Sequence, residues 1–314
     1  MKKLGVAVIG AGFWGRNHAR NFRELDETEL LAICDTNPER AKTAAEQFQI
    51  EAYTDNRKLL KRRDIEAVTI CTWSTKLASE ALRALKAGKH VLVEKPMAHN
   101  VRQARKLLDL AQEKERLLTV GFLMRFIPGI QHIKEAINKR EIGTLVCATA
   151  KRVSRWPERI GDVGVVKDIA IHDIDIVRYL FNQDPTAVYA KTGALKHKFE
   201  DYAQIMLAFD EGKTAFIEAN WLTPYKIRKL VVTGSEAIMN LDYLTQEVTV
   251  ETARQTLTPR YKQIEPLKLE LQHFSNCIMN DKEPMITGID GLKALQIAQR
   301  ALVSAEKCTT VKLK

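Results

Sequence analysis

The sequence predicts an α/β fold: an N-terminal doubly wound parallel sheet, followed by an α+β domain with a large, mostly antiparallel sheet. Three observations predict it. Short apolar runs alternate with helical patterns over roughly the first 120 residues, a glycine motif follows the first of these runs, and closely spaced strand patterns dominate the remainder. Strands that alternate with helices form right-handed βαβ units and therefore a parallel sheet.

The N-terminal part is expected to contain five strands with helices between them. The expected strands span 4–9, 30–34, 67–71, 90–94 and 118–121, and the expected helices span 16–25, 38–48, 76–87 and 101–115. Pro38 at the first position of one helix and Gly88 just past the end of another are typical of helix boundaries.

After Gly121 the regular alternation of strand and helix patterns ends, so we expect domains at 1–122 and 123–314 without a flexible linker. Helices are expected at 128–138, 168–181, 267–279 and 291–307, and strands at 145–150, 186–192, 203–209, 214–220, 229–234, 237–241 and 247–251. Short strands separated by turn signals are typical of a mostly antiparallel sheet.

The composition is that of a soluble globular protein, with 45% hydrophobic and 28% charged residues. No apolar run approaches the roughly 18 to 20 residues of a membrane helix, so we expect no membrane partner and a cytoplasmic location. The apolar start runs directly into the glycine motif, which favours a first strand over a signal peptide. The five cysteines are scattered, so we expect neither a disulfide nor a metal site.

The formal charge of +10 would attract nucleic acid, but it would equally attract small molecules that carry phosphate. Nucleic-acid-binding proteins usually show clustered basic residues with interleaved aromatics. Here the basic residues are spread along the predicted helices, so we expect no nucleic-acid partner.

A G-x-G-x-x-G motif, Gly10-Ala11-Gly12-Phe13-Trp14-Gly15, follows the first strand and opens the first helix. This context is typical of the dinucleotide-binding Rossmann fingerprint. Gly10 would permit a tight turn, Gly12 would let the backbone approach a pyrophosphate, and Gly15 would allow the helix to pack on the strand. The alternative is a glycine-rich turn without a ligand. Phe13 and Trp14 complete the candidate phosphate loop.

Asp35 ends the second predicted strand, about twenty residues after the last glycine of the motif. An acidic residue there binds the adenosine ribose hydroxyls and repels a 2′-phosphate, so NAD is favoured over NADP. Arg40 is close enough in sequence to offset part of this preference. The alternative is that Asp35 is a plain turn or cap residue.

Glu94-Lys95-Pro96 follows the fourth predicted strand. Ligands of open α/β sheets bind at the carboxyl ends of the strands, so Lys95 is expected beside the cofactor. Its ammonium could polarise a carbonyl or a developing alkoxide oxygen. For Lys95 alone, a surface lysine is an equal alternative, and the sequence leaves the isomer of the bond before Pro96 open.

Asp168, His172 and Asp175 are spaced to share one face of a helix that is otherwise rich in isoleucine. An imidazole is suited to accept a proton from an alcohol, and a neighbouring carboxylate can orient it. The alternative is a helix start capped by Asp168 with His172 in the core.

Together these segments resemble the Gfo/Idh/MocA oxidoreductases over essentially the whole chain. The resemblance rests on the glycine motif, the run 87–96, the segment 168–175 and the closing pattern Glu283-Pro284 to Gly291. It implies that Lys95, Asp168 and His172 are catalytic, and that Thr72, Trp73 and Glu94 line the cofactor. Trp73 and Leu77 replace the family's usual Pro and His, and Ile127 replaces its usual Asn.

Segments 121–128, 159–168 and 220–228 are also similar to UDP-N-acetylglucosamine 3-dehydrogenases. This resemblance implies a sugar or UDP-sugar substrate bound by Arg125, Arg159 and Lys226 beside Lys95, Asp168 and His172. Arg228 would add a fourth cation for a diphosphate. The family also implies a homodimer or homotetramer formed through the C-terminal sheet. The alternatives are an inositol or free-sugar dehydrogenase and, in another class, a non-catalytic dinucleotide-sensing protein.

Overall fold

The computed structural model describes residues 3–157 and 161–313. They form two compact units, which are described separately. The first comprises Met1–Leu123 and Glu265–Leu292, and the second comprises Met124–Ile264 and Lys293–Lys314. Residues 265–292 therefore belong to the first unit, although they follow most of the second unit in sequence. The expected division into 1–122 and 123–314 assigned them to the second domain.

The first unit is built on a six-stranded parallel sheet with strand order β3-β2-β1-β4-β5-β6. Its strands are β1 (Leu4–Ile9), β2 (Thr28–Cys34), β3 (Glu51–Tyr53), β4 (Ala67–Ile70), β5 (His90–Val93) and β6 (Leu118–Val120). Its helices are α1 (Phe13–Glu24), α2 (Pro38–Phe48), α3 (Asn56–Leu60), α4 (Ser74–Lys86), α5 (Val101–Glu113) and α8 (Pro266–Met279). The doubly wound parallel sheet predicted from the sequence is confirmed.

Helix α8 explains why the chain returns to the first unit. Leu267, Leu271 and Phe274 are almost fully buried and join the core cluster that contains Phe22 of α1. Helix α1 therefore packs on the sheet with one side and on α8 with another. Burying these apolar side chains stabilises the unit, since a fully buried Leu or Phe contributes about 1.5–3 kcal/mol.

Two short elements of the first unit were not predicted, β3 and α3. The three residues of β3 are all at least partly exposed, and α3 has only five residues. Neither is long enough for a hydrophobic period to show in the sequence.

The second unit contains a nine-stranded mixed sheet with strand order β14-β13-β12-β11-β7-β10-β9-β8-β15. Its strands are β7 (Leu145–Arg155), β8 (Ala187–Gly193), β9 (Tyr202–Ala208), β10 (Thr214–Asn220), β11 (Leu222–Gly234), β12 (Ala237–Asp242), β13 (Glu247–Thr252), β14 (Thr256–Leu257) and β15 (Val311–Lys312). The pair β7–β10 is parallel and the other pairs are antiparallel, which confirms the mostly antiparallel sheet.

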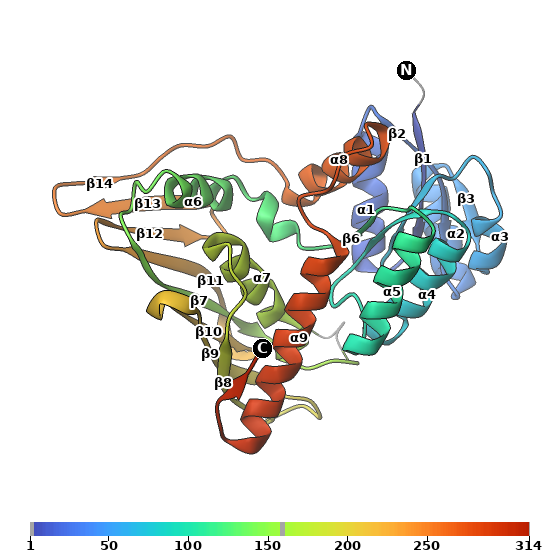
Figure 1. The fold of residues 1–314 in the computed structure, drawn as a ribbon. Coiled ribbons are helices and arrows are strands. Elements are labelled where there is room, and N and C mark those ends of the chain that lie inside the picture. The colour runs from blue at the N-terminus through green and yellow to red at the C-terminus, as the bar shows by residue number, and fades with distance from the viewer. Residues whose placement is uncertain (1–2, 158–160, 314) are drawn as a thin grey trace. The chain divides into compact units, whose positions relative to one another are not determined.

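Helices α6 (Pro128–Asn138) and α7 (Ile171–Phe181) lie beside this sheet (Figure 1). The short helical segments η1 (Leu123–Phe126), η2 (Val166–Ala170) and η3 (Asp210–Gly212) interrupt the connections, and the division between the units falls inside α9 (Gly288–Lys307). The helix expected at 168–181 thus begins two residues earlier, as the π-helical segment η2.

Strand β11 is longer than the expected strand 229–234. Its first part contains Pro224 and charged residues, and its pairing with β7 is irregular between Leu222 and Ile227. Proline is unusual in a paired strand, which is why the sequence pattern understated the length. Over the described part of the chain, every helix falls short of the length or the apolar character needed to cross a membrane.

Candidate functional site

The glycine motif forms a tight loop between β1 and α1. Gly10 has a φ of +105°, and a Cβ there would lie 2.4 Å from the carbonyl oxygen of Cys71. A Cβ at Gly15 would lie 1.7 Å from the carbonyl oxygen of Gly10. Both positions therefore require glycine for the fold itself, as the sequence predicted.

Gly12 differs from the other two glycines of the motif. A Cβ at this position would meet none of the described atoms within 4 Å. Gly12 is also the N-cap of α1, and as a glycine it has no side chain to cap the helix start. Open space beside the N–H groups of a helix start fits the pyrophosphate of a dinucleotide. The loop residues present therefore fit the expected cofactor.

Asp35 closes the loop from the end of β2. One carboxylate oxygen accepts a hydrogen bond from the backbone N–H of Ala11 and the other from that of Asn37, both at 2.9 Å. Arg40 lies 3.6 Å from the same carboxylate, and its side chain is 52% exposed. The carboxylate thus faces the candidate cofactor loop, where its charge favours ribose hydroxyls over a 2′-phosphate.

The β4–α4 loop carries Thr72 and Trp73 to the reversal point of the sheet order, between β1 and β4. A Cβ at Gly10 would lie 3.1 Å from the backbone nitrogen of Thr72, so the two loops touch. Trp73 is 54% exposed, and Phe13 of the glycine loop is 58% exposed. Dinucleotides bind at such reversal points, so both aromatic side chains are available to a cofactor there.

Glu94 and Lys95 follow the end of β5. Glu94 is buried, and its carboxylate lies 3.0 Å from Nε2 of His18 on α1. Lys95 is partly buried, and the Lys95–Pro96 peptide bond is cis. The sequence did not point to His18, because a histidine inside a helix gives no signal of a partner 76 residues away.

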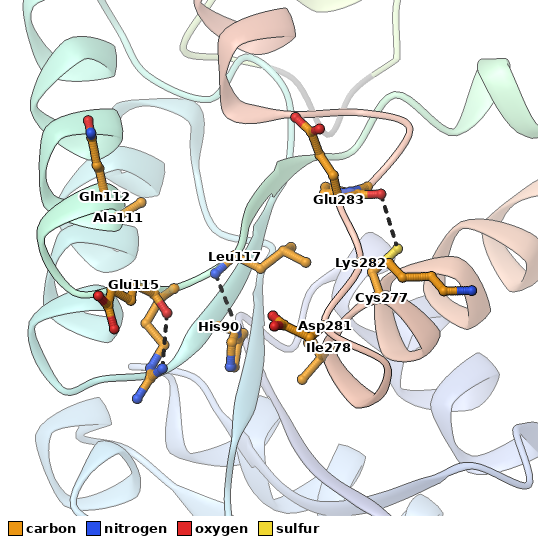
Figure 2. Close-up of a pocket in the computed structure, with 12 residues that line it drawn as sticks. His90, Ala111, Gln112, Glu115, Leu117, Cys277, Ile278, Asp281, Lys282 and Glu283 are labelled. Atoms are coloured by element: carbon orange, nitrogen blue, oxygen red, sulfur yellow. Dashed lines mark hydrogen bonds between the residues drawn. The ribbon is translucent and has the colours of Figure 1, made fainter.

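A cleft of roughly 350 Å³ lies at the opposite, amino ends of β5 and β6 (Figure 2). His90 lines it and accepts a hydrogen bond from the backbone N–H of Leu117 at 3.1 Å. Burial, reinforced by Arg116, lowers the pKa of His90 to about 4. Because substrates of open α/β sheets bind at the carboxyl ends of the strands, this cleft is not the candidate active site.

In the second unit, Asp168 lies on η2 and His172 at the start of α7. Both are buried, with 4% and 7% exposure. The loop before them is fixed by Glu200, whose backbone oxygen and carboxylate accept hydrogen bonds from Val165 and Val166 at 2.9 and 3.2 Å. Burial raises the pKa of Glu200. The two candidate catalytic side chains therefore stand on a firmly held helix start.

Two buried ion pairs hold α7 in place. Arg152 of β7 donates two hydrogen bonds to Asp173, at 2.9 and 2.7 Å, and Arg125 of η1 donates two to Asp175, at 2.8 and 2.6 Å. The sequence placed Asp175 on the catalytic face and Arg125 at the substrate. Arg125 is only 3% exposed and already faces a carboxylate, so a substrate anion would have to compete with Asp175.

The sequence analysis did not identify Arg152. The available signal was the pair Asp173 and Asp175, because acidic residues among isoleucines need buried cations as partners. Burial disfavours its charge, but Asp173, with smaller effects from Tyr243 and Asp168, outweighs it and raises the pKa of the guanidinium. The neighbouring Arg228, together with partial burial and Arg152, lowers the pKa of Lys226. Arg152, Arg228 and Lys226 thus form a group of interacting cations, which we call the cation row.

Three aromatic rings lie at the same end of the sheet as the cation row. Trp156 stacks on His197 with ring centroids 3.5 Å apart, and Trp221 meets Trp156 edge-on at 4.6 Å. Aromatic side chains with a few placed polar groups are typical of small-molecule sites. Arg159, the remaining candidate substrate ligand, lies outside the described residues. Within those residues, no group of three or more acidic, His or Cys side chains is placed to hold a metal ion.

Comparison with known proteins identifies the family. Residues 4–122 match the model of an oxidoreductase family with an NAD-binding Rossmann fold, and residues 130–240 match the Gfo/Idh/MocA C-terminal domain. The chain belongs to the Gfo/Idh/MocA oxidoreductase family. It is therefore an NAD-dependent oxidoreductase, and its residues 4–122 match the NAD-binding Rossmann domain of that family.

Members of the family are similar to this chain over nearly its full length. The uncharacterized oxidoreductase YrbE of Bacillus subtilis is 32% identical, covering 96% of this chain and 94% of its own. The scyllo-inositol 2-dehydrogenase (NAD(+)) of the same organism is 30% identical, covering 99% and 96%. The structure of the UDP-N-acetylglucosamine 3-dehydrogenase GnnA from Acidithiobacillus ferrooxidans has a TM-score of 0.90 at 26% identity, covering 98% and 99%.

Proposed function

We propose that this Gfo/Idh/MocA protein transfers a hydride between a secondary alcohol of a UDP-N-acetylhexosamine and NAD. The observation that carries the proposal is the cation row. Arg228 depresses the pKa of Lys226, so these two charges repel each other at this site. A diphosphate would offset this repulsion, whereas a neutral polyol would not.

The roles of the catalytic residues follow from their chemistry. His172 accepts the hydroxyl proton, and Asp168 orients the imidazole and stabilises its charged form. Lys95 stabilises the charge on the reacting oxygen. Bound NAD supplies the hydride acceptor. The backbone of the Gly12 loop and the carboxylate of Asp35 hold the cofactor, and much of the rate enhancement comes from positioning and fixed charge.

Inositol or free-sugar oxidation is the second candidate, and the 30% identity to scyllo-inositol 2-dehydrogenase favours it. The two candidates are separated by incubating the pure protein and NAD with UDP-N-acetylglucosamine, N-acetylglucosamine, myo-inositol or scyllo-inositol and recording NADH absorbance. We expect turnover with the UDP-sugar alone. Turnover with an inositol, and none with the UDP-sugar, would favour the second candidate.

A matched pair of variants tests the cation row directly. Lys226→Met removes one of its charges, and Lys229→Met removes a lysine of the same strand that pairs across from Asp242 and Lys151. We expect Lys226→Met to raise the KM for the UDP-sugar about tenfold, equivalent to about 1.4 kcal/mol, and Lys229→Met to leave it unchanged. Equal effects of the two variants would remove Lys226 from the substrate site.

We also propose that two copies pair through the sheet of the second unit. Phe216 of β10 and Met206 of β9 are cross-strand partners, and they are 45% and 37% exposed. Ile238 of β12 is exposed to a similar degree. Exposed apolar patches of this kind are typical of interfaces. Light scattering on the wild type and on Phe216→Lys tests this, because the variant should lower the oligomer mass.

A further inference from the structure

His18 and Glu94 form a buried pair between the cofactor helix and the catalytic strand. Nε2 of His18 lies 3.0 Å from Oε1 of Glu94, and the side chains are 0% and 7% exposed. When the carboxylate is ionised it can only accept, and Nε2 then donates the hydrogen of this bond. Nδ1 of His18 meets no hydrogen-bond partner among the described residues. Among the described residues, Glu94 is therefore the one hydrogen-bond partner of the imidazole.

The second oxygen of Glu94 reaches the residue that follows it. Oε2 accepts a hydrogen bond from the backbone N–H of Lys95 at 3.2 Å. The carboxylate thus joins His18 on one side to the backbone of Lys95 on the other. A carboxylate held at both oxygens fixes the backbone from which the lysine side chain extends.

Gly121 leaves the space in which this carboxylate sits. A Cβ at Gly121 would lie 3.1 Å from the carboxyl carbon and from both oxygens of Glu94, closer than ordinary contact. The backbone N–H of Gly121 also bonds the carbonyl of Val93, so its position next to Glu94 is fixed. Three elements, α1, the end of β5 and the end of β6, therefore meet at one carboxylate.

We propose that His18 is a positioning residue for Lys95, acting through Glu94; this inference rests on the proposed role of Lys95 in the reaction. His18 lies three residues after Gly15, on the helix whose first N–H groups fit the cofactor pyrophosphate. The same helix thus holds the cofactor at its start and the catalytic lysine segment through His18. A displacement of a reacting group by about 1 Å can lower turnover a hundredfold, so this contact controls kcat.

Two substitutions of His18 separate the hydrogen bond from packing. His18→Gln keeps an N–H donor near the position of Nε2, whereas His18→Leu fills the space without a donor. With NAD and UDP-N-acetylglucosamine as the assay, or an inositol if the panel above identifies one as substrate, we expect His18→Leu to lower kcat about 10- to 100-fold. We expect the Kd for NAD to change less than about threefold, and His18→Gln to recover most of kcat.

His90 provides a matched control. It is a histidine at the start of β5, the strand that Glu94 follows, and it accepts a hydrogen bond from the backbone N–H of Leu117 (Figure 2). His90→Leu should lower the melting temperature without lowering kcat. A double-mutant cycle of His18→Leu and Glu94→Ala separates an effect that passes through Glu94 from a general loss of packing around His18. If His18 acts through Glu94, His18→Leu should change kcat less than about threefold in a Glu94→Ala background.

The outcomes are distinguishable. Loss of kcat in His18→Leu, recovery in His18→Gln and no further loss in the Glu94→Ala background support the inference. A kcat for His18→Leu within threefold of wild type, or fully additive effects of the two substitutions, would overturn it while Lys95→Ala still abolished turnover. Turnover that survived Lys95→Ala would overturn both this inference and the proposed function.

Discussion

Arg152 and Asp173 are joined by two hydrogen bonds of 2.9 and 2.7 Å and are 2% and 1% exposed. One residue lies on β7 and the other on α7, the helix whose second residue is His172. A buried pair of this kind fixes the rotation of the helix about its axis, because both oxygens of the carboxylate are engaged. The position of His172, the candidate catalytic histidine, thus depends on a buried charge pair between β7 and α7.

Removing one partner of this pair should destabilise the second unit strongly. Arg152→Met leaves the carboxylate of Asp173 buried without its cation, and we expect a loss of about 3–5 kcal/mol in the free energy of unfolding. Urea unfolding measures it. The double variant Arg152→Met/Asp173→Leu should recover a large part of the loss, and Lys139→Met, at an exposed ion pair, should leave the urea midpoint unchanged. A single variant as stable as wild type would contradict this reading.

His90 should make the first unit less stable as the pH falls. Its folded pKa of about 4 lies below the ordinary 6.5, because burial disfavours the charged ring. Below pH 6.5 the unfolded chain binds a proton that the folded chain does not, so stability is lost between about pH 6.5 and pH 4. The loss attributable to His90 is up to about 3 kcal/mol.

A His90→Asn variant, which keeps an acceptor for the N–H of Leu117, isolates this contribution. Its unfolding free energy should fall less steeply than that of the wild type over the same pH range. Parallel curves for the two proteins would show that His90 does not titrate as its burial implies.

Gly12 and Gly15 should respond to alanine in opposite ways. The Cβ of Gly12→Ala points into open space, so we expect an unchanged melting temperature and at least a tenfold weaker binding of NAD by calorimetry. The Cβ of Gly15→Ala would collide with the carbonyl of Gly10, so that variant should lose about 2–3 kcal/mol of stability or more. Normal NAD affinity in Gly12→Ala would place the pyrophosphate elsewhere.

Asp35 should control the choice between NAD and NADP. Asp35→Ser removes the charge that faces the loop and leaves Arg40 without its carboxylate partner. We expect the KM for NAD to rise about tenfold and measurable turnover with NADP to appear, since Arg40 could then meet a 2′-phosphate. Steady-state rates with both cofactors measure this, and an unchanged ratio of the two would argue against a ribose contact.

The sequence was sufficient for the parts of the fold that repeat a regular pattern. Four elements were predicted with the bounds that the structure has, at 4–9, 38–48, 128–138 and 214–220. Apolar periodicity marks the extent of such elements, and a proline marks the start of the two helices. The irregular start of β11 and the return of α8 to the first unit were not predicted. Both depend on contacts between residues that are distant in the chain, which no local pattern encodes.

Site residues that belong to a sequence motif could be predicted. The side chains that pair with site residues from distant parts of the chain could not. The glycine loop and Asp35 stand in the structure as their spacing implied. The partners Arg152 and His18 carry no motif, since a strand arginine and a helix histidine are common residues. Arg125 was assigned to the substrate from its charge, and its bond to Asp175 could be found only from the folded chain.

The most direct test of the proposed reaction is turnover in Lys95→Ala and His172→Ala, measured as NADH formation beside the affinity for NAD. We expect each substitution to lower kcat at least about a hundredfold while NAD binds within about threefold of wild type. Near wild-type turnover in both variants would remove these residues from the mechanism and contradict the proposed reaction.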